Sequence, residues 1–312
     1  MKDAIEVRDL RKTFGDFVAV RDVSFHVERG EIFGYLGANG AGKSTTIRML
    51  CGLLAPTAGQ ALVAGHDVAR APARVKSSIG YMSQKFSLYL DLPALHNLEF
   101  FGGIYGLRGK ALARAIDAAV ERTGLGAHRS ATTGSLPGGI RQRLALACAI
   151  LHDPFIVFLD EPTAGVDPAS RRDFWRLIRE LAAGGTTVFV TTHYMDEAEY
   201  CARIGLMVDG RLVALDAPDA LKRRFVPGET LAVDGRGLHR GLEAARALPS
   251  VVAAAPFGAR LHVRFREGAV DEAGLRRALE ASGASITRVE PVESSLEDVF
   301  LEVVGGGAVE AA

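Results

Sequence analysis

The sequence has few cysteines, and the three that it contains lie far apart. Cys51, Cys148 and Cys201 form no pair with the spacing of a metal or redox site. An odd and scattered set of this kind is typical of small core residues in a reducing compartment. We therefore expect these cysteines to be buried and unpaired.

Long apolar runs are also missing. The longest, around Leu144–Leu151 and Phe155–Leu159, are separated by His152-Asp153-Pro154, and neither reaches the ~20 residues that a membrane-spanning helix needs. The first residues, Met1-Lys2-Asp3-Ala4-Ile5-Glu6, do not contain the apolar core of a signal peptide. We expect a soluble chain that needs a partner for any role at a membrane.

The sequence lacks net charge as well. Lys+Arg and Asp+Glu both number 37, which gives no indication of nucleic-acid binding. A length of 312 residues allows about two domains. The hydrophobic fraction of 48% and the charged fraction of 24% are those of an ordinary globular protein.

One glycine-rich stretch, G-A-N-G-A-G-K-S, dominates the first part of the chain. It follows an apolar, strand-like run at residues 32–36 and precedes an apparent helix at residues 45–50. This order of strand, loop and helix is what a phosphate-binding P-loop requires, whereas an ordinary turn requires none of it. The glycines let backbone amides converge on phosphate oxygens, and the helix dipole favours the same anion. The candidate nucleotide-binding residues are Gly37, Ala38, Asn39, Gly40, Ala41, Gly42, Lys43, Ser44 and Thr45.

Strands and helices alternate along the first two-thirds of the chain, which predicts a parallel sheet covered on both faces. The expected strands are residues 5–7, 23–27, 61–63, 79–82, 155–159 and 187–190, and the expected helical segments are residues 93–125, 135–150 and 168–182.

Two of the expected strands end in residues that suit phosphate chemistry. The strand at 155–159 stops at Asp160 and Glu161, and His193 follows the strand at 187–190. The carboxyl ends of parallel strands meet beside the P-loop, where Asp160 can hold Mg²⁺ and Glu161 can activate a water. Alone, an Asp-Glu pair is an ordinary loop start and a histidine is usually structural; beside a P-loop we prefer the catalytic reading.

Together these motifs resemble the nucleotide-binding subunit of ATP-binding-cassette (ABC) transporters. G-A-N-G-A-G-K-S is similar to the Walker A motif of that family, Y-M-S-Q to its Q-loop and I-V-F-L-D-E to its Walker B motif. A-G-V-D is similar to the D-loop, T-T-H to the switch histidine and K-T-F-G to the aromatic A-loop. Two segments are most similar to those of ATPases of ABC-2-type exporters, including those for drugs: Y-M-S-Q-K-F-S-L-Y and T-H-Y-M-D-E-A-E.

The resemblance implies a fold and a set of roles. The fold is a P-loop NTPase (RecA-like) parallel core sheet with an antiparallel β subdomain and a helical insert. ATP and Mg²⁺ are the implied ligands. Phe14 would stack on adenine, although Phe17 lies close by in the sequence. The implied catalytic residues are Glu161, His193 and Gln84, the implied Mg²⁺ residues are Ser44, Gln84 and Asp160, and the D-loop residue is Asp167.

The signature loop departs from the family pattern. L-S-G-G-Q is usual, and here the five residues are Leu136, Pro137, Gly138, Gly139 and Ile140. The family serine donates a hydrogen bond to the γ-phosphate of the partner's ATP, which Pro137 cannot do. Loss of such a bond costs about 1.5–3 kcal/mol if nothing replaces it. Either the loop acts through backbone contacts alone, or this chain pairs with a different, fully equipped chain.

The resemblance also implies partners. Two nucleotide-binding subunits, in a homodimer or a heterodimer, would enclose ATP between Walker A of one chain and the signature loop of the other. An integral membrane permease subunit of ABC-2 type would place the chain at the cytoplasmic face of the cell membrane. Phe86, Leu88, Tyr89 and Leu92 would contact the permease, or else belong to the core.

Two other functions are weaker. A soluble ABC ATPase that acts on ribosomes or nucleic acid usually carries two cassettes or a long coiled-coil insertion, and this sequence has neither feature nor a basic surface. An ATP-dependent kinase leaves the signature and switch motifs unexplained.

The last third of the chain is expected to be a separate module. We place the ABC ATPase domain at residues 1–225 with a helical subdomain at about 86–150, a small α+β domain at 226–304 and a disordered tail at 305–312. The α+β domain has a β-α-β-β-α-β-like order with expected strands at 230–233, 261–265 and 285–289. Ser294-Ser295-Leu296-Glu297 has the form of a capping box. On the helix that follows, Leu296, Val299, Phe300 and Val303 form an apolar stripe that packs on its own domain or serves dimer contact or regulation.

Overall fold

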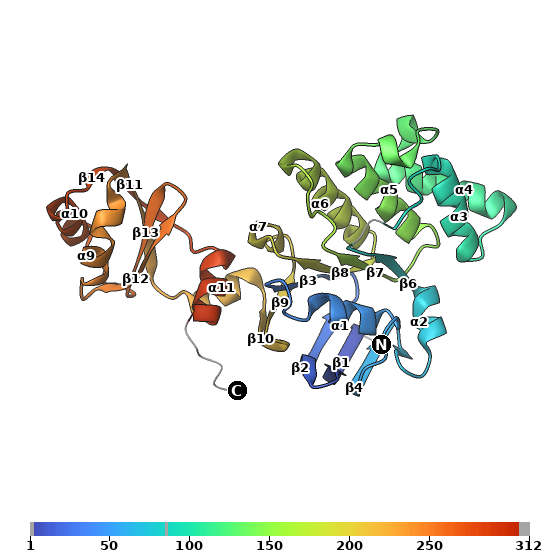
Figure 1. The fold of residues 1–312 in the computed structure, drawn as a ribbon, viewed down its shortest axis with the longest axis horizontal. Helices are drawn as coiled ribbons and strands as arrows, with labels where there is room; N and C mark the ends of the chain where they lie inside the picture. The colour runs from blue at the N-terminus through green and yellow to red at the C-terminus, as the bar shows by residue number, and fades with distance from the viewer. Residues whose placement is uncertain (1–2, 85–86, 306–312) are drawn as a thin grey trace. The chain divides into compact units, whose positions relative to one another are not determined.

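The chain is divided into two compact units, Met1–Pro218 and Asp219–Ala312. The computed structural model describes residues 3–84 and 87–305 (Figure 1). The division falls at the start of helix α8 (Pro218–Phe225), earlier than the linker expected at Val226-Pro227-Gly228. Within the described residues, every helix is too short or too polar to span a lipid bilayer.

The first unit is built on a six-stranded sheet in the order β10-β9-β3-β8-β7-β6. All neighbouring strands run parallel except β9 and β10, which form an antiparallel pair at one edge. Every residue of β7 and β8 is buried, as expected for strands covered on both faces. The strands are β3 (Ile32–Gly37), β6 (Ile79–Met82), β7 (Ile156–Asp160), β8 (Thr187–Thr192), β9 (Arg203–Val208) and β10 (Arg211–Asp216).

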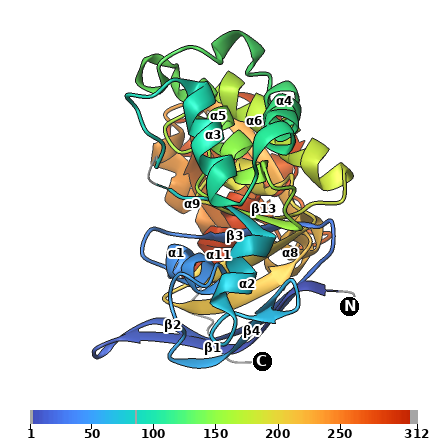
Figure 2. The same ribbon diagram turned by 90° about the vertical axis from the view of Figure 1, so that its right-hand side faces the viewer.

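Helices cover both faces of this sheet. Figures 1 and 2 show α1 (Lys43–Leu50) on one face and α6 (Pro168–Ala183) on the other. The face of α1 is closed by a second, antiparallel sheet in the order β2-β1-β4-β5. Rings from both layers pack together there, with the centroids of Phe25 and Phe33 5.4 Å apart. The second sheet consists of β1 (Asp3–Phe14), β2 (Phe17–Glu28), β4 (Ala58–Val63) and β5 (His66–Asp67).

A group of helices with its own apolar core completes the first unit. It contains α3 (Ala94–Ile104), α4 (Gly109–Thr123) and α5 (Gly138–Ile150), whose buried side chains include Leu98, Val120 and Leu144. The helical segment expected at 93–125 is broken after Ile104, where Gly106 has a φ of 83°. The expected helix at 135–150 begins at Gly138, because Ser135 closes a 3₁₀ turn and Pro137 is extended.

The second unit has one antiparallel sheet in the order β12-β13-β11-β14. The strands are β11 (Glu229–Arg236), β12 (Val251–Phe257), β13 (Arg260–Phe265) and β14 (Ser285–Val292), and the helices are α9 (Leu242–Arg246), α10 (Glu272–Ala281) and α11 (Leu296–Gly305). This is the expected β-α-β-β-α-β order with α11 added. The range of β12 was not predicted, because Pro256 and three alanines give it little strand character; it is an edge strand, where proline is tolerated.

Helix α11 begins with a capping box, but one residue later than predicted. The Ser295 hydroxyl accepts a hydrogen bond from the Asp298 backbone N–H at 3.2 Å, and the Asp298 carboxylate accepts one from the Ser295 N–H at 2.8 Å. Of the expected apolar stripe, Leu296 and Val299 are buried, and Phe300 and Val303 are half-buried. The helix therefore starts one residue further along than the Ser294–Glu297 box implied.

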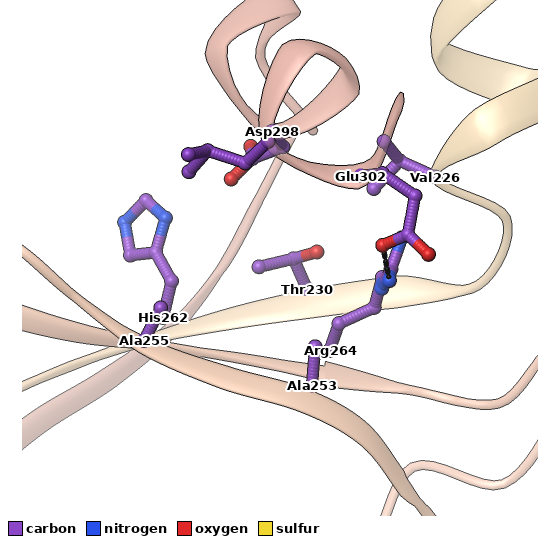
Figure 3. A pocket seen from close by; sticks show the side chains of 9 residues that line it. Val226, Thr230, Ala253, Ala255, His262, Arg264, Asp298 and Glu302 are labelled. Atoms are coloured by element: carbon purple, nitrogen blue, oxygen red, sulfur yellow. Dashed lines mark hydrogen bonds and ion pairs between the residues drawn. The ribbon is translucent and has the colours of Figure 1, made fainter. Parts of the chain in front are cut away.

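A hollow of about 160 Å³ lies between the β-sheet of the second unit and α11 (Figure 3). His262 and Arg264 extend from β13 into it, and Asp298 and Glu302 face them from α11. Arg264 and Glu302 form an ion pair with a nitrogen–oxygen distance of 2.5 Å. Burial lowers the pKa of His262 below its ordinary value. These contacts fasten α11 to the sheet of its own unit.

Candidate functional site

The P-loop is held in shape by close backbone packing. Gly42, the residue before α1, has a φ of 103°, and a Cβ atom there would lie 2.5 Å from the carbonyl oxygen of Ala19. The Lys43 ammonium donates hydrogen bonds to the carbonyl oxygens of Gly37 at 2.8 Å and Ala38 at 3.1 Å. Burial lowers the pKa of Lys43, while the nearby Glu161 carboxylate acts in the opposite direction. The loop thus holds a cation against its own backbone carbonyl oxygens.

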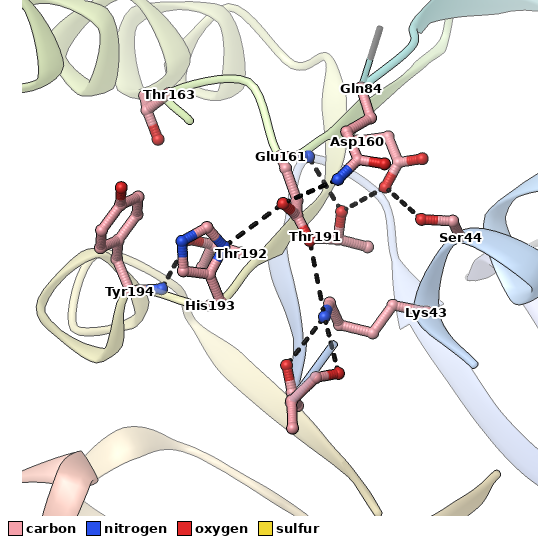
Figure 4. Close-up of polar contacts among 12 residues, drawn as sticks. Lys43, Ser44, Gln84, Asp160, Glu161, Thr163, Thr191, Thr192, His193 and Tyr194 are labelled. Atoms are coloured by element: carbon pink, nitrogen blue, oxygen red, sulfur yellow. Dashed lines mark hydrogen bonds and ion pairs between the residues drawn. The ribbon is translucent and has the colours of Figure 1, made fainter. Parts of the chain in front are cut away.

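Glu161 is the meeting point of three motifs that are far apart in the sequence (Figure 4). Its Oε1 lies 3.5 Å from Lys43 Nζ. Its Oε2 accepts a hydrogen bond from Gln84 Nε2 at 3.0 Å and lies 3.3 Å from His193 Nδ1. The predicted catalytic residues Glu161, His193 and Gln84 are therefore brought together beside the P-loop lysine.

The backbone of Glu161 is strained. Its φ of 50° lies in the left-handed region, which is unusual for a residue with a side chain. The Glu161 N–H donates to both the carbonyl oxygen and the Oγ1 of Thr191, at 3.1 and 3.0 Å. Two hydrogen bonds thus hold this conformation and aim the carboxylate at the P-loop.

Asp160 lies beside the P-loop serine. Its Oδ1 accepts hydrogen bonds from Ser44 Oγ at 3.2 Å and from Thr191 Oγ1 at 2.7 Å. Burial raises the pKa of Asp160, and these two hydrogen bonds oppose that shift. Thr191 was not predicted as a site residue, although it is a hydroxyl at the end of a buried strand and joins Asp160 to Glu161.

The residues fit a magnesium ion that is bound together with a nucleotide. Among the residues that the structure describes, there is no group of three His, Cys, Asp or Glu side chains that would hold a metal alone. Mg²⁺ needs no such group when phosphates and waters supply most of its oxygen ligands. Ser44 Oγ and Asp160 Oδ1, 3.2 Å apart, are hard oxygen donors of the required kind.

The signature loop lies at the start of α5. Pro137 precedes the helix, where a missing N–H removes no helical hydrogen bond, and its carbonyl accepts from Arg141 N at 2.9 Å. Gly139 packs against α6: a Cβ atom there would lie 2.6 Å from both Cβ and Oγ of Ser170. Leu136 is buried and Ile140 is partly buried against the helical core. The trans role of the five residues stays a prediction.

Asp167 caps α6. Its Oδ1 accepts hydrogen bonds from Ala169 N at 3.1 Å and Ser170 N at 3.0 Å. These bonds hold the pKa of Asp167 below its ordinary value. The residue thus has a clear local function, and its expected D-loop role stays a prediction.

Two aromatic side chains lie exposed at the turn between β1 and β2. Phe14 is 50% exposed and Phe17 is 63% exposed, and Lys12 Nζ lies 5.2 Å from the centre of the Phe14 ring. Either ring is accessible to an adenine base. The assignment of Phe14 to this role stays a prediction.

The apolar segment expected to contact a membrane subunit is partly exposed. Leu88 is buried in the helical core, Leu92 is half-buried, and Phe86 lies outside the described residues. Tyr89 is exposed and meets Phe100 edge-on, with 5.0 Å between the ring centres.

Three further exposed side chains were not predicted for this surface. They are Leu90, just after Tyr89, and Phe100 and Ile104 on α3. The adjacent apolar pair Phe100-Phe101 was the available signal, because it widens the apolar face of α3 beyond what its buried side needs. We call Tyr89, Leu90, Phe100 and Ile104 the α3 patch.

Three family models match the chain. One, described as ABC transporter, matches residues 20–164, which include the P-loop, the signature loop and the Asp160-Glu161 pair. Another, described as ATP-binding protein DrrA1-3-like, C-terminal domain, matches residues 217–304. The third, described as AAA domain, putative AbiEii toxin, Type IV TA system, matches only residues 135–195, a shorter range than either of the other two.

Curated relatives match the same regions. The chain is 56% identical over 225 residues to the probable multidrug ABC transporter ATP-binding protein YbhF of Escherichia coli (strain K12), a match that covers 72% of this chain and 39% of YbhF. It is 36% identical over 306 residues to the daunorubicin resistance ATP-binding protein DrrA3 of Streptomyces coeruleorubidus, covering 97% of this chain and 96% of DrrA3. The chain thus spans well under half of YbhF and nearly all of DrrA3.

A solved structure shares the fold of the first unit. The chain matches the dimeric post-hydrolysis state of the ATP-binding cassette MJ0796 bound to ADP and Pi with a TM-score of 0.63 and 25% identity, covering 68% of this chain and 98% of that one. The P-loop NTPase fold expected from the sequence is confirmed, and the alternative of a ribosome- or nucleic-acid-directed ATPase is not favoured. The chain belongs to the family of ABC transporter ATP-binding proteins.

Proposed function

We propose that this chain binds and hydrolyses ATP and that the reaction powers an exporter through a separate membrane subunit. The observation that carries the proposal is the position of the Glu161 carboxylate, within 3.5 Å of Lys43 and in contact with Gln84 and His193. A carboxylate held beside a phosphate-binding lysine is suited to orient and deprotonate a water.

The residues divide the work of hydrolysis between them. The P-loop amides and Lys43 bind the β- and γ-phosphates, and Glu161 orients the attacking water with help from Gln84. His193 contacts the γ-phosphate from the side and shares Glu161 Oε2 with Gln84. Ser44 and Asp160 would hold Mg²⁺, which when bound neutralises charge on the phosphate oxygens.

Two cassettes are needed for the complete site. We infer that a second nucleotide-binding subunit, the same chain or a different one, supplies its signature loop to the ATP bound at this P-loop. ATP binds the closed pair better than the open pair because its γ-phosphate contacts both halves, so ATP shifts the equilibrium to closure and hydrolysis reverses it.

We propose an integral membrane permease of ABC-2 type as the transport partner, with the chain at the cytoplasmic face of the cell membrane. The α3 patch supports this, because exposed aromatic and aliphatic side chains on a helix and on the segment before it are typical of a protein contact. YbhF is named as a probable multidrug ABC transporter ATP-binding protein and DrrA3 as a daunorubicin resistance ATP-binding protein, which agrees with export.

Purification of the chain with its permease in lipid vesicles tests the proposal. We expect the permease to stimulate ATP hydrolysis and Phe100→Glu to abolish the stimulation while basal hydrolysis remains. Phe155→Glu is the matched control, because Phe155 is also exposed but lies outside the helical core, just before β7. If no integral membrane protein copurifies, or if both variants behave alike, the transport proposal fails.

A further inference from the structure

Glu197 is a buried carboxylate that none of the roles above uses. It lies in the short helix α7 (Met195–Ala198), just after the switch histidine, and is 2% exposed. Burial of an ionised side chain is unfavourable unless partners compensate for the lost water. The contacts of Glu197 therefore indicate what the residue does.

Each oxygen of Glu197 holds a different segment of the site. Oε1 accepts a hydrogen bond from Thr163 Oγ1 at 2.6 Å, and Oε2 accepts one from Thr192 Oγ1 at 2.8 Å. Thr163 comes two residues after Glu161, and Thr192 comes directly before His193. One carboxylate thus ties together the two segments that carry the catalytic pair.

Two further contacts extend this link. Thr192 Oγ1 also accepts a hydrogen bond from Tyr194 N at 3.0 Å, so the residues on both sides of His193 are fixed. Arg171 of α6 lies 3.8 Å from Glu197 Oε1, and its guanidinium stacks on the Tyr194 ring at 4.4 Å. The helix capped by Asp167 is therefore joined to the same carboxylate.

We propose that Glu197 is a positioning residue that holds His193 at its 3.3 Å contact with Glu161. Figure 4 shows Thr163, Thr192 and Tyr194 placed around this pair. The proposal rests on the proposed ATP hydrolysis. Without Glu197, the segments on β7 and β8 keep their strands, but the turns that follow the strands lose their common anchor.

The test compares Glu197→Ala with wild type in single-turnover and steady-state ATP hydrolysis. We expect kcat to fall on the order of 10- to 100-fold, because small misplacements of reacting groups have effects of this size. KM for ATP should stay within about twofold, because Glu197 accepts hydrogen bonds from Thr163 and Thr192, whereas Lys43 donates to carbonyl oxygens of the P-loop itself. Glu197→Gln keeps the shape and one acceptor oxygen, so it should restore most of the rate.

Glu31→Ala is the matched control. Glu31 is also buried and paired with an arginine, Arg203, at 2.7 Å, but it precedes β3 and lies at the end of the sheet away from the P-loop. Both alanine variants should lower the thermal stability of the protein. Glu31→Ala should leave kcat unchanged. If loss of stability alone lowered kcat, the fall would appear in both variants.

A double-mutant cycle shows whether the effect acts through His193. In a His193→Ala background, Glu197→Ala should cause little further loss, because the group that it positions is absent. If Glu197→Ala does not fold, Thr192→Val removes only the hydrogen bond between Glu197 and the residue before His193, and it should lower kcat. Thr192→Ser keeps the hydroxyl and should keep the wild-type rate.

Three results would overturn the inference: an unchanged kcat in Glu197→Ala, an equal loss in the presence and absence of His193, or a parallel rise in KM. These results are distinct from failure of the proposed function, in which the wild-type chain itself hydrolyses no ATP or Glu161→Gln hydrolyses it normally.

Discussion

The contact between Gly139 and Ser170 makes a quantitative prediction about the signature loop. In Gly139→Ala, the new Cβ would lie 2.6 Å from Ser170 Cβ and Oγ, whereas ordinary contacts are 3.4–4 Å. Helices α5 and α6 must therefore move apart by about 0.8 Å, and overpacking of this kind costs about 1–3 kcal/mol. The gain in helix propensity from glycine to alanine is less than the ~1 kcal/mol of a helix interior, because Gly139 is the second residue of α5, so most of the overpacking cost remains.

Gly138→Ala provides the control for stability. Nothing lies within 4 Å of the position of its Cβ, so this variant should gain helix propensity without a clash. In denaturant unfolding of the isolated chain, the free energy of unfolding should be higher for Gly138→Ala than for wild type, and lower for Gly139→Ala. A shift of the loop by most of an ångström should also lower ATP hydrolysis on the order of 10- to 100-fold.

Ser170→Gly is a second substitution, which relieves the clash that Gly139→Ala creates. Combined with Gly139→Ala, it should return stability and ATP hydrolysis toward the values of Ser170→Gly alone, which gives a favourable coupling energy of about 1–3 kcal/mol. If Gly139→Ala is as stable and active as wild type, or if the coupling energy is zero, the two helices do not pack at Gly139 as the structure has them.

Three further predictions concern the loop proline, a buried histidine and the adenine contact. Pro137→Ser should raise the affinity of the ATP-dependent dimer about tenfold or more, because it restores one charged hydrogen bond. Size-exclusion chromatography measures the dimer, and an unchanged affinity would show that backbone contacts suffice. Burial lowers the pKa of His152, whose Nε2 donates to the Ile79 carbonyl at 3.1 Å. As pH falls through 6.5, the histidine of the unfolded chain is protonated before that of the folded chain, and the protein therefore loses stability. His152→Gln should lose less stability than wild type on acidification, measured by calorimetry, and an equal loss would refute this. Phe14→Ala should weaken ATP binding about tenfold and Phe17→Ala should not, by fluorescent-nucleotide titration; the reverse order would transfer the adenine contact to Phe17.

The sequence was sufficient for the parts of the site that depend on local order. The P-loop is recognisable because its glycines, Lys43 and Ser44 are contiguous and lie between a strand and a helix. The pair Asp160-Glu161 follows a fully apolar strand, and parallel strands end at the same edge of the sheet, so its position beside the P-loop followed from topology. The structure confirms that Glu161 meets Gln84 and His193.

The residues that were missed act through contacts between distant segments. Thr191 serves Asp160 and Glu161, and Glu197 serves Thr163, but a threonine or a glutamate in such segments is ordinary in sequence terms. Only the packing of neighbouring strands brings them together. Sequence patterns alone therefore predicted the candidate catalytic residues and not the residues that contact and support them.

The capping box of α11 shows a different limit. Two overlapping patterns, Ser294 to Glu297 and Ser295 to Asp298, satisfy the same rule at adjacent positions. The structure forms the second pair, and the helix begins at Leu296. The local sequence pattern does not distinguish between the two caps.

The central claim is that Glu161 activates the water that attacks ATP, and Glu161→Gln tests it most directly. The amide keeps the shape of the side chain but cannot take up a proton, so hydrolysis should fall at least about 100-fold. ATP binding should persist, because Lys43 and the P-loop backbone are unchanged, and an ATP-dependent dimer should accumulate on size-exclusion chromatography. Hydrolysis at the wild-type rate in Glu161→Gln would contradict the account.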